Sequence, residues 1–155
     1  MLEIERKFLV TNNDFLKETT SSSKLVQGYL NSDKERTVRI RIQEEKAFLT
    51  IKGKSSENGI SRFEWEKEIK VHDAELLLQL CEKGIISKTR HYVIFEDFIV
   101  EVDVFDGENE GLIVAEIELK SEDQNVDLPN WIGTEVTGDK RYYNSYLSAN
   151  SFKKW

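Results

Sequence analysis

The first ten residues, MLEIERKFLV, place charged side chains at every second position. Glu3, Glu5 and Lys7 share one parity, and the residues between them are mostly apolar. Since successive side chains of a β-strand point to opposite faces, this period predicts a strand with two carboxylates and an ammonium group on one face. Two carboxylates spaced in this way can reach one divalent cation, and Mg²⁺ and Mn²⁺ prefer oxygen ligands.

The same alternation returns in six later segments. Basic side chains alternate with apolar ones in TVRIRI, FLTIKG and SKTRHY, which gives Arg39, Arg41, Lys52, Lys88 and Arg90. Charged side chains alternate in RFEWEKEI, VEVDVF and VAEIEL, which gives Arg62, Glu64, Glu66, Glu68, Glu101, Asp103, Glu116 and Glu118. Arg and Lys neutralise phosphate oxygens, and carboxylates opposite them can hold a metal ion. This combination is what metal-dependent polyphosphate chemistry requires.

Two structures are compatible with these charged faces. Antiparallel sheets often pack one face on a core and expose the other, so the charges could lie on a solvated surface. Alternatively, the strands close into a barrel with the charged face inside and the apolar face outside, where helices would cover it. Such an interior must hold water, metal ions and a polyanion, because isolated buried charges are costly. Periodicity alone leaves both open, and the scarcity of uncharged polar residues on these faces favours the barrel.

The elements that would position these residues are mainly strands. Strand patterns cover residues 1–10, 24–32, 37–43, 47–54, 62–71, 86–95, 98–105 and 112–120. Asn58-Gly59 is a hairpin signal. Helices are expected over 11–20 with Asn12 or Asn13 as cap, over 73–84 ending at Gly84, and over 140–150 with Asp139 as cap. Neighbouring strands of this kind favour an antiparallel sheet.

Composition narrows the class of protein. The 155 residues suit one domain, and a net charge of -7 with a pI near 5.0 argues against nucleic-acid binding. A single cysteine, Cys81, excludes an internal disulfide. Because no secretory signal or membrane-length apolar run is present, a cytoplasmic protein is expected, with no membrane partner.

Taken together, the charged motifs resemble those of the CYTH, or triphosphate tunnel metalloenzyme, superfamily. The opening Glu3-x-Glu5-x-Lys7 is similar to its signature, and VRIRI, TIKG, SRFEWEKEI, KTR, EVDVF, AEIEL and GTEVTGDKRYYNSYL follow in the family's order. The resemblance covers residues 1–155 as a single CYTH domain. It implies an α+β fold, an eight-stranded antiparallel β-barrel with flanking helices. It also implies hydrolysis or cyclisation of a triphosphate with Mg²⁺ or Mn²⁺.

The resemblance also implies roles for individual residues. Glu3, Glu5, Glu116 and Glu118 would surround one metal ion, whereas Glu101 and Asp103 would bind a second metal or orient basic side chains. The substrate-binding set would be Lys7, Arg39, Arg41, Lys52, Arg62, Lys88 and Arg90. Lys7, Glu66 and Lys88 would be catalytic, with a water attacking in line, although Glu66 and Glu64 could instead form salt bridges with Arg62. Lys140 and Arg141 are expected at a solvated helix end.

The expected activity is hydrolysis of inorganic tripolyphosphate, by a monomer or a homodimer. The enzymatic alternatives are a class IV-type adenylate cyclase and a thiamine or nucleoside triphosphatase. The alternative from another class is a non-enzymatic polyphosphate-binding module, which the abundant carboxylates disfavour. The sequence offers no nucleophile–base pair: Cys81 lies in a helical apolar stripe, His91 is on the parity opposite Arg90, and His72 is near a helix start.

Overall fold

A computed structural model describes all residues, 1–155, and strands make up most of it. The strands are β1 (Leu2–Val10), β2 (Thr19–Asn31), β3 (Arg36–Gln43), β4 (Lys46–Gly53), β5 (Ser61–Ile69), β6 (Ile86–Phe95), β7 (Phe98–Phe105), β8 (Ile113–Glu118) and β9 (Ile132–Glu135). The helices are α1 (Phe15–Glu18), α2 (Val71–Leu78) and α3 (Asn144–Ala149), with short 3₁₀ turns at η1 (Gly107–Asn109), η2 (Lys140–Tyr142) and η3 (Phe152–Lys154).

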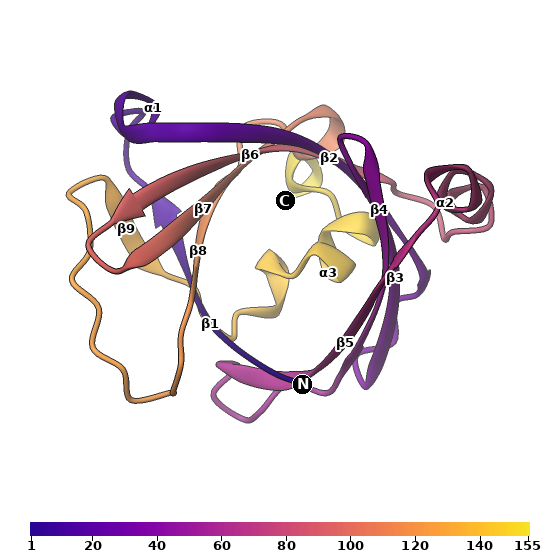
Figure 1. Cartoon of the computed structure of the whole chain (residues 1–155), viewed down its shortest axis with the longest axis horizontal. Coiled ribbons are helices and arrows are strands. Elements are labelled where there is room, and N and C mark those ends of the chain that lie inside the picture. Colours follow the sequence, from indigo (N-terminus) through magenta and orange to yellow (C-terminus); the bar gives the residue numbers. More distant parts are fainter.

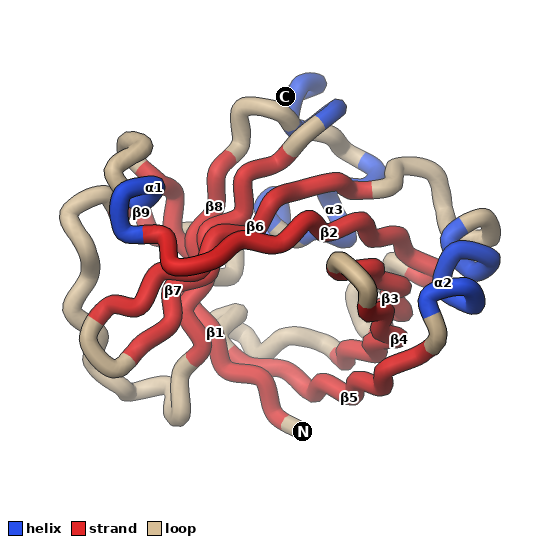
Figure 2. Tube along the Cα trace, turned by 45° about the horizontal axis from the view of Figure 1, so that its top comes forward, coloured by secondary structure: helices blue, strands red, loops and turns tan.

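The strands form one antiparallel sheet that closes on itself (Figure 1). Their order is β5-β4-β3-β2-β6-β7-β8-β1-β9, and β1 also pairs with β5. One edge of β1 is divided: Leu2–Ile4 pair with β5, and Phe8 and Val10 pair with β9. Closure therefore uses eight strands, with β9 as an extra strand, which confirms the predicted barrel. Figure 2 shows the strands curving around a central opening, with α2 outside it.

Strand register brings the charged parities onto the same inner face. Glu3 pairs with Arg62 across the closing β1–β5 contact, and Lys7 pairs with Glu116 across β1–β8. In the neighbouring β7–β8 pair, Glu101 of β7 lies opposite Glu116 of β8. Because opposed residues of antiparallel strands project to the same side, each strand adds its charged residues to one interior. The barrel alternative is therefore the observed one.

The outward apolar residues form two cores. The larger centres on Phe8, Val100, Val102 and Ile117, and α1 covers it through Phe15, as does the 119–131 segment through Leu119 and Trp131. The smaller centres on Ile40, Ala47 and Ala74, the last of these from α2. The expectation of helical cover is thus met by α1 and α2, whereas an irregular segment covers the rest.

A third apolar cluster lies inside the barrel. Ile86, Phe105 and Val114 share the inward parity of Lys88, Asp103 and Glu116, and they pack with Leu112 and Leu147. Leu147 belongs to α3, which lies within the outline of the barrel when viewed along its opening (Figure 1). The C-terminal segment therefore packs into one end of the barrel and anchors there through apolar contacts.

Truncation of Leu147 tests this anchor. Leu147 is 1% exposed, so the change Leu147→Ala leaves a cavity among Ile86, Phe105 and Val114. We expect a loss of about 2–5 kcal/mol in the free energy of unfolding, measured by urea denaturation. The matched control is Leu80→Ala, because Leu80 is 73% exposed. Equal midpoints for both variants would contradict a packed α3.

The helices differ in extent from those predicted. Helix α2 ends at Leu78 rather than at Gly84, so Cys81 lies beyond the helix, and Leu76 and Leu80 are exposed. The chain leaves the helix because β2 binds it: Glu82 N donates to Tyr29 O, and Cys81 packs closely on Gly28. Tertiary contacts here override the local helical pattern. Every helix is too short or too polar to serve as a membrane span.

Two smaller predictions also change, and one strand was not predicted. Helix α1 starts after Asp14 with no side-chain cap, and the Asn12 side chain instead accepts from Asp14 N in the preceding turn. The predicted C-terminal helix is divided into η2 and α3, although Asp139 does cap its start by accepting from Arg141 N. The four-residue β9 carries too short a pattern to be found from the sequence.

Candidate active site

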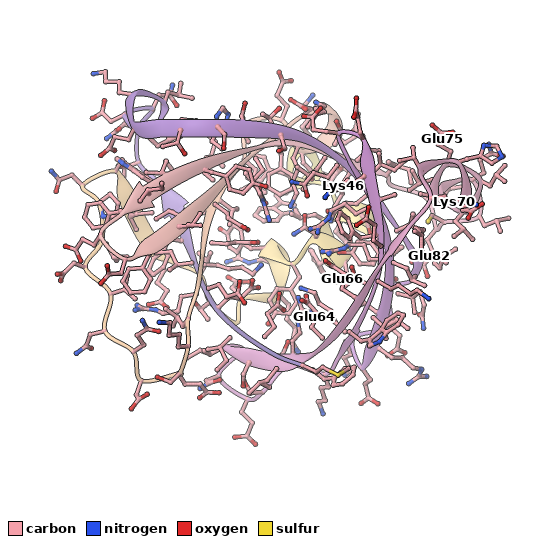
Figure 3. All side chains as sticks on the ribbon, viewed as in Figure 1. Lys46, Glu64, Glu66, Lys70, Glu75 and Glu82 are labelled. Carbon is pink, nitrogen blue, oxygen red and sulfur yellow. The ribbon has the colours of Figure 1, made fainter.

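The barrel interior encloses a strongly polar cavity of about 260 Å³. All predicted site residues except Asp103 line it: Glu3, Glu5, Lys7, Arg39, Arg41, Lys52, Arg62, Glu66, Lys88, Arg90, Glu101, Glu116 and Glu118. Glu64 lines it as well, and Figure 3 shows Glu64 and Glu66 on the interior side of the barrel wall. Glu68 lies outside the lining, and Arg141 is exposed and pairs with Asp139, as expected for a solvated helix end.

Sequence reasoning missed five lining residues: Tyr29, Thr37, Tyr143, Asn144 and Ser145. Thr37 shares the parity of Arg39 and could have been found by extending that alternation. The last three come from the start of α3, whose position inside the barrel only the tertiary structure reveals. His91 packs against the ring of Phe15 on the outer side, so its predicted orientation away from the tunnel is confirmed.

Lys7 is buried between two carboxylates. Its Nζ lies 2.7 Å from Glu116 Oε1 and 3.0 Å from Glu5 Oε1. Burial by itself would lower the pKa of Lys7, but the charges of Glu116 and Glu5 outweigh it and raise that pKa. Burial would likewise raise the pKa of Glu116, but Lys7 and Arg90 hold it well below its usual range. Both groups are therefore charged at neutral pH.

Glu118 has no ion-pair partner, whereas its acidic neighbours Glu3, Glu5 and Glu64 each have one. Glu118 lies opposite Glu5 in the β1–β8 register. Burial and then the nearby charges of Glu3, Glu64 and Glu5 raise the pKa of Glu118. This region of the cavity therefore carries surplus negative charge, and a bound cation would relieve it.

The donor set suits a hard divalent cation. No three acidic, histidine or cysteine side chains converge on one point in this structure, and several carboxylates bond to basic neighbours. Glu3, for example, accepts from Lys52 at 2.8 Å and from Arg62 at 3.2 Å. The possible metal-ligand atoms near Glu118 are all carboxylate oxygens, which Mg²⁺ and Mn²⁺ prefer. The residues present therefore fit such an ion.

Asp103 supports basic side chains beside the cavity. It is fully buried and accepts from Lys88 Nζ at 2.6 Å and from Arg90 Nε at 2.7 Å. Burial would raise the pKa of Asp103, but Arg90 and Lys88 lower it. Of the two roles predicted for Asp103, this geometry favours orientation of basic groups. Glu101 does line the cavity and pairs with Arg90.

Lys88 is a buried cavity lysine whose pKa is lowered. Burial outweighs the attraction of Asp103 and lowers the pKa of Lys88 to about 8. Its Nζ also donates to Asn144 Oδ1 of α3 at 3.1 Å. A lysine in this state can exchange a proton near neutral to alkaline pH.

Arg39 and Arg41 lie farther from their carboxylate partner than the other cavity cations do. They share Glu66, with nitrogen–oxygen distances of 3.5 Å and 3.6 Å. Burial, together with the charges of Arg39 and Arg90, lowers the pKa of Arg41 to about 10. The β3 wall of the cavity therefore has surplus positive charge and free donors, opposite in sign to the surroundings of Glu118.

Fold and interior together define a class of protein: a closed antiparallel barrel whose charged tunnel can hold a metal-bound polyanion. The model of the CYTH domain matches residues 1–145, and the chain therefore belongs to the CYTH domain family. The predicted family and barrel are confirmed, and membership implies a divalent-metal cofactor. The extension of that domain over all of 1–155 stays a prediction.

Named relatives and a solved structure agree with this assignment. The chain is 49% identical to an inorganic triphosphatase of Acetivibrio thermocellus over 154 residues, 99% of this chain and 97% of the relative. It is 40% identical to an inorganic triphosphatase of Nitrosomonas europaea over 154 residues, 97% of this chain and 99% of the relative. A crystal structure described as an inorganic triphosphatase matches with a TM-score of 0.67 and 36% identity, covering 94% of this chain and 93% of that one.

Proposed function

We propose that this protein hydrolyses inorganic tripolyphosphate with Mg²⁺ or Mn²⁺ as cofactor. The observation that carries the proposal is the division of charge within one cavity. Free Nε donors of Arg39 and Arg41 lie on one wall, and Glu118, which has no cationic partner, lies near the charges of Glu3, Glu5 and Glu64 elsewhere. A pure anion binder gains nothing from those carboxylates, whereas a metal–triphosphate complex uses both. The names of the two relatives support the same substrate.

The basic and acidic residues of the cavity would have separate roles. Arg39 and Arg41 bind phosphate oxygens of the chain, and Lys52, Arg62 and Arg90 do so from the other walls. Glu3, Glu5, Glu116 and Glu118 are the residues that would hold the cation, which when bound offsets the charge that develops in phosphoryl transfer.

Lys7 would contact the terminal phosphoryl group, since it lies between Glu5 and Glu116. Lys88 would accept the proton of the attacking water, because its pKa is lowered to about 8. We favour Lys88 over Glu66 in this role. Glu66 is already engaged by Thr50 at 2.7 Å and by the two arginines, so it orients them.

Phosphate release tests the proposal directly. Tripolyphosphate, ATP and thiamine triphosphate are compared side by side with Mg²⁺, Mn²⁺ or EDTA, and cyclic AMP is measured in the ATP reactions. We expect fast, metal-dependent release from tripolyphosphate and little from ATP. Cyclic AMP with pyrophosphate would instead establish a cyclase, and preference for thiamine triphosphate or ATP would establish another triphosphatase. Tripolyphosphate binding without turnover would leave a polyphosphate-binding module.

A further inference from the structure

Gln27 of β2 is a buried polar side chain that nothing in the protein satisfies. It is 0% exposed, and neither Nε2 nor Oε1 has a hydrogen-bond partner. A buried amide left unpaired costs folding free energy, so such groups are rare in native proteins. An apolar residue of similar size at this position would make the folded protein more stable. This suggests that Gln27 has a role other than stabilising the fold.

Strand register places Gln27 at the boundary of the cavity. It lies opposite Arg41 of β3 on one side and opposite Ile86 of β6 on the other. Arg41 lines the cavity, and Ile86 belongs to the apolar cluster that anchors α3. Side chains of directly opposed residues stand about 4.5–5.5 Å apart at Cβ, so Gln27 and Arg41 are neighbours on the inner face.

The unsatisfied donors of the interior gather at this wall. Nε of Arg39 and Nε of Arg41 are also buried without a partner. Lys7, Lys52, Arg62, Lys88 and Arg90, by contrast, each have a carboxylate oxygen within 3.2 Å. An arginine that presents its two terminal nitrogens to a phosphate end-on leaves Nε free for a protein acceptor. Gln27 supplies an amide oxygen, an acceptor of that kind, from the adjacent strand.

We infer that Gln27 is a positioning residue for Arg41 in binding of the triphosphate. Its Oε1 accepts from Arg41 Nε when the guanidinium turns its terminal nitrogens to the phosphate chain. This inference rests on the proposed function, and it adds a residue that does not itself line the cavity.

The test is substitution of Gln27 by Met, which keeps the length of the side chain and removes both polar atoms. Tripolyphosphate binding is measured by calorimetry in EDTA, so that turnover plays no part, and thermal unfolding is followed in parallel. We expect Gln27→Met to weaken binding about tenfold, because a hydrogen bond to a charged group is lost. The same variant should unfold at a higher temperature than the parent protein, since no amide is left unpaired.

Gln43→Met is the matched control. Gln43 lies on the same face of β3, two residues from Arg41, but its amide already donates to Tyr92 Oη at 2.8 Å. This variant should therefore unfold at a lower temperature and bind tripolyphosphate as the parent protein does. The inference is supported if Gln27→Met raises the unfolding temperature, Gln43→Met lowers it, and only Gln27→Met weakens binding.

A double-mutant cycle separates positioning from a general structural effect. In an Arg41→Ala background, Gln27→Met should cause no further loss of binding if it acts through Arg41. Unchanged binding by Gln27→Met alone, or full additivity with Arg41→Ala, would overturn the inference and leave the proposed function intact. A parent protein that neither binds tripolyphosphate in EDTA nor hydrolyses it with Mg²⁺ or Mn²⁺ would overturn both.

Discussion

Replacing Glu5 by Gln is expected to abolish metal-dependent phosphate release while the barrel stays folded. Glu5 lies opposite Glu118 where carboxylates are in surplus, so the change removes one charge from the group that would hold the cation. Loss of groups that merely support a metal ligand typically costs about 10–100-fold, so loss of a ligand itself should cost more than about 100-fold. Initial rates are measured over a range of Mn²⁺ and Mg²⁺ concentrations.

The matched control for this prediction is Glu68→Gln. Glu68 is exposed and, unlike Glu66 on the same strand and parity, does not line the cavity. It should retain the parent rate. Circular dichroism and the unfolding midpoint check that Glu5→Gln is folded, since Lys7 keeps its contact with Glu116 at 2.7 Å. A Glu5→Gln variant with the parent rate and metal dependence would refute the assignment of Glu5 as a ligand.

Lys88→Arg is expected to remove the increase in activity that the parent protein should show as the pH rises toward about 8. Burial lowers the pKa of Lys88 to about 8, so below that pH the side chain is protonated and cannot accept a proton. For the parent protein, kcat/KM should therefore increase with pH and level off above about 8. An arginine stays protonated throughout this range, so the variant should lose about 10²–10⁴-fold in kcat and show no such rise.

The pH profile distinguishes a base from a simple phosphate ligand. If Lys88 acts only as a cation, Lys88→Arg would keep most of its rate, and the parent activity would fall rather than rise above pH 8. Lys46→Arg, at an exposed position of β4, is the control for the substitution itself and should leave the profile unchanged. If Lys88→Arg shows the pH profile of the parent protein, the general base must instead be Glu66 or another tunnel carboxylate.

The period-two pattern alone determined which residues share a face. Alternation is a local property of the strand, so Glu3, Glu5 and Lys7 could be grouped before any fold was known. The same reasoning grouped Arg39 with Arg41 and Lys88 with Arg90, and all of these line the cavity. The motifs in sequence order then indicated the family, because their combination is far more specific than any one of them.

Only the tertiary structure decided which charges meet and how each one is held. Closure through Glu3 and Arg62 turns a charged face into an interior, and the pairing of distant strands carries no local signal. Asp103 illustrates the limit: its parity put it on the charged face, but only the structure shows that it pairs with Lys88 and Arg90 of β6 and does not line the cavity. The place of α3 inside the barrel and the unpaired amide of Gln27 depend on packing between segments far apart in the chain, which periodicity cannot encode.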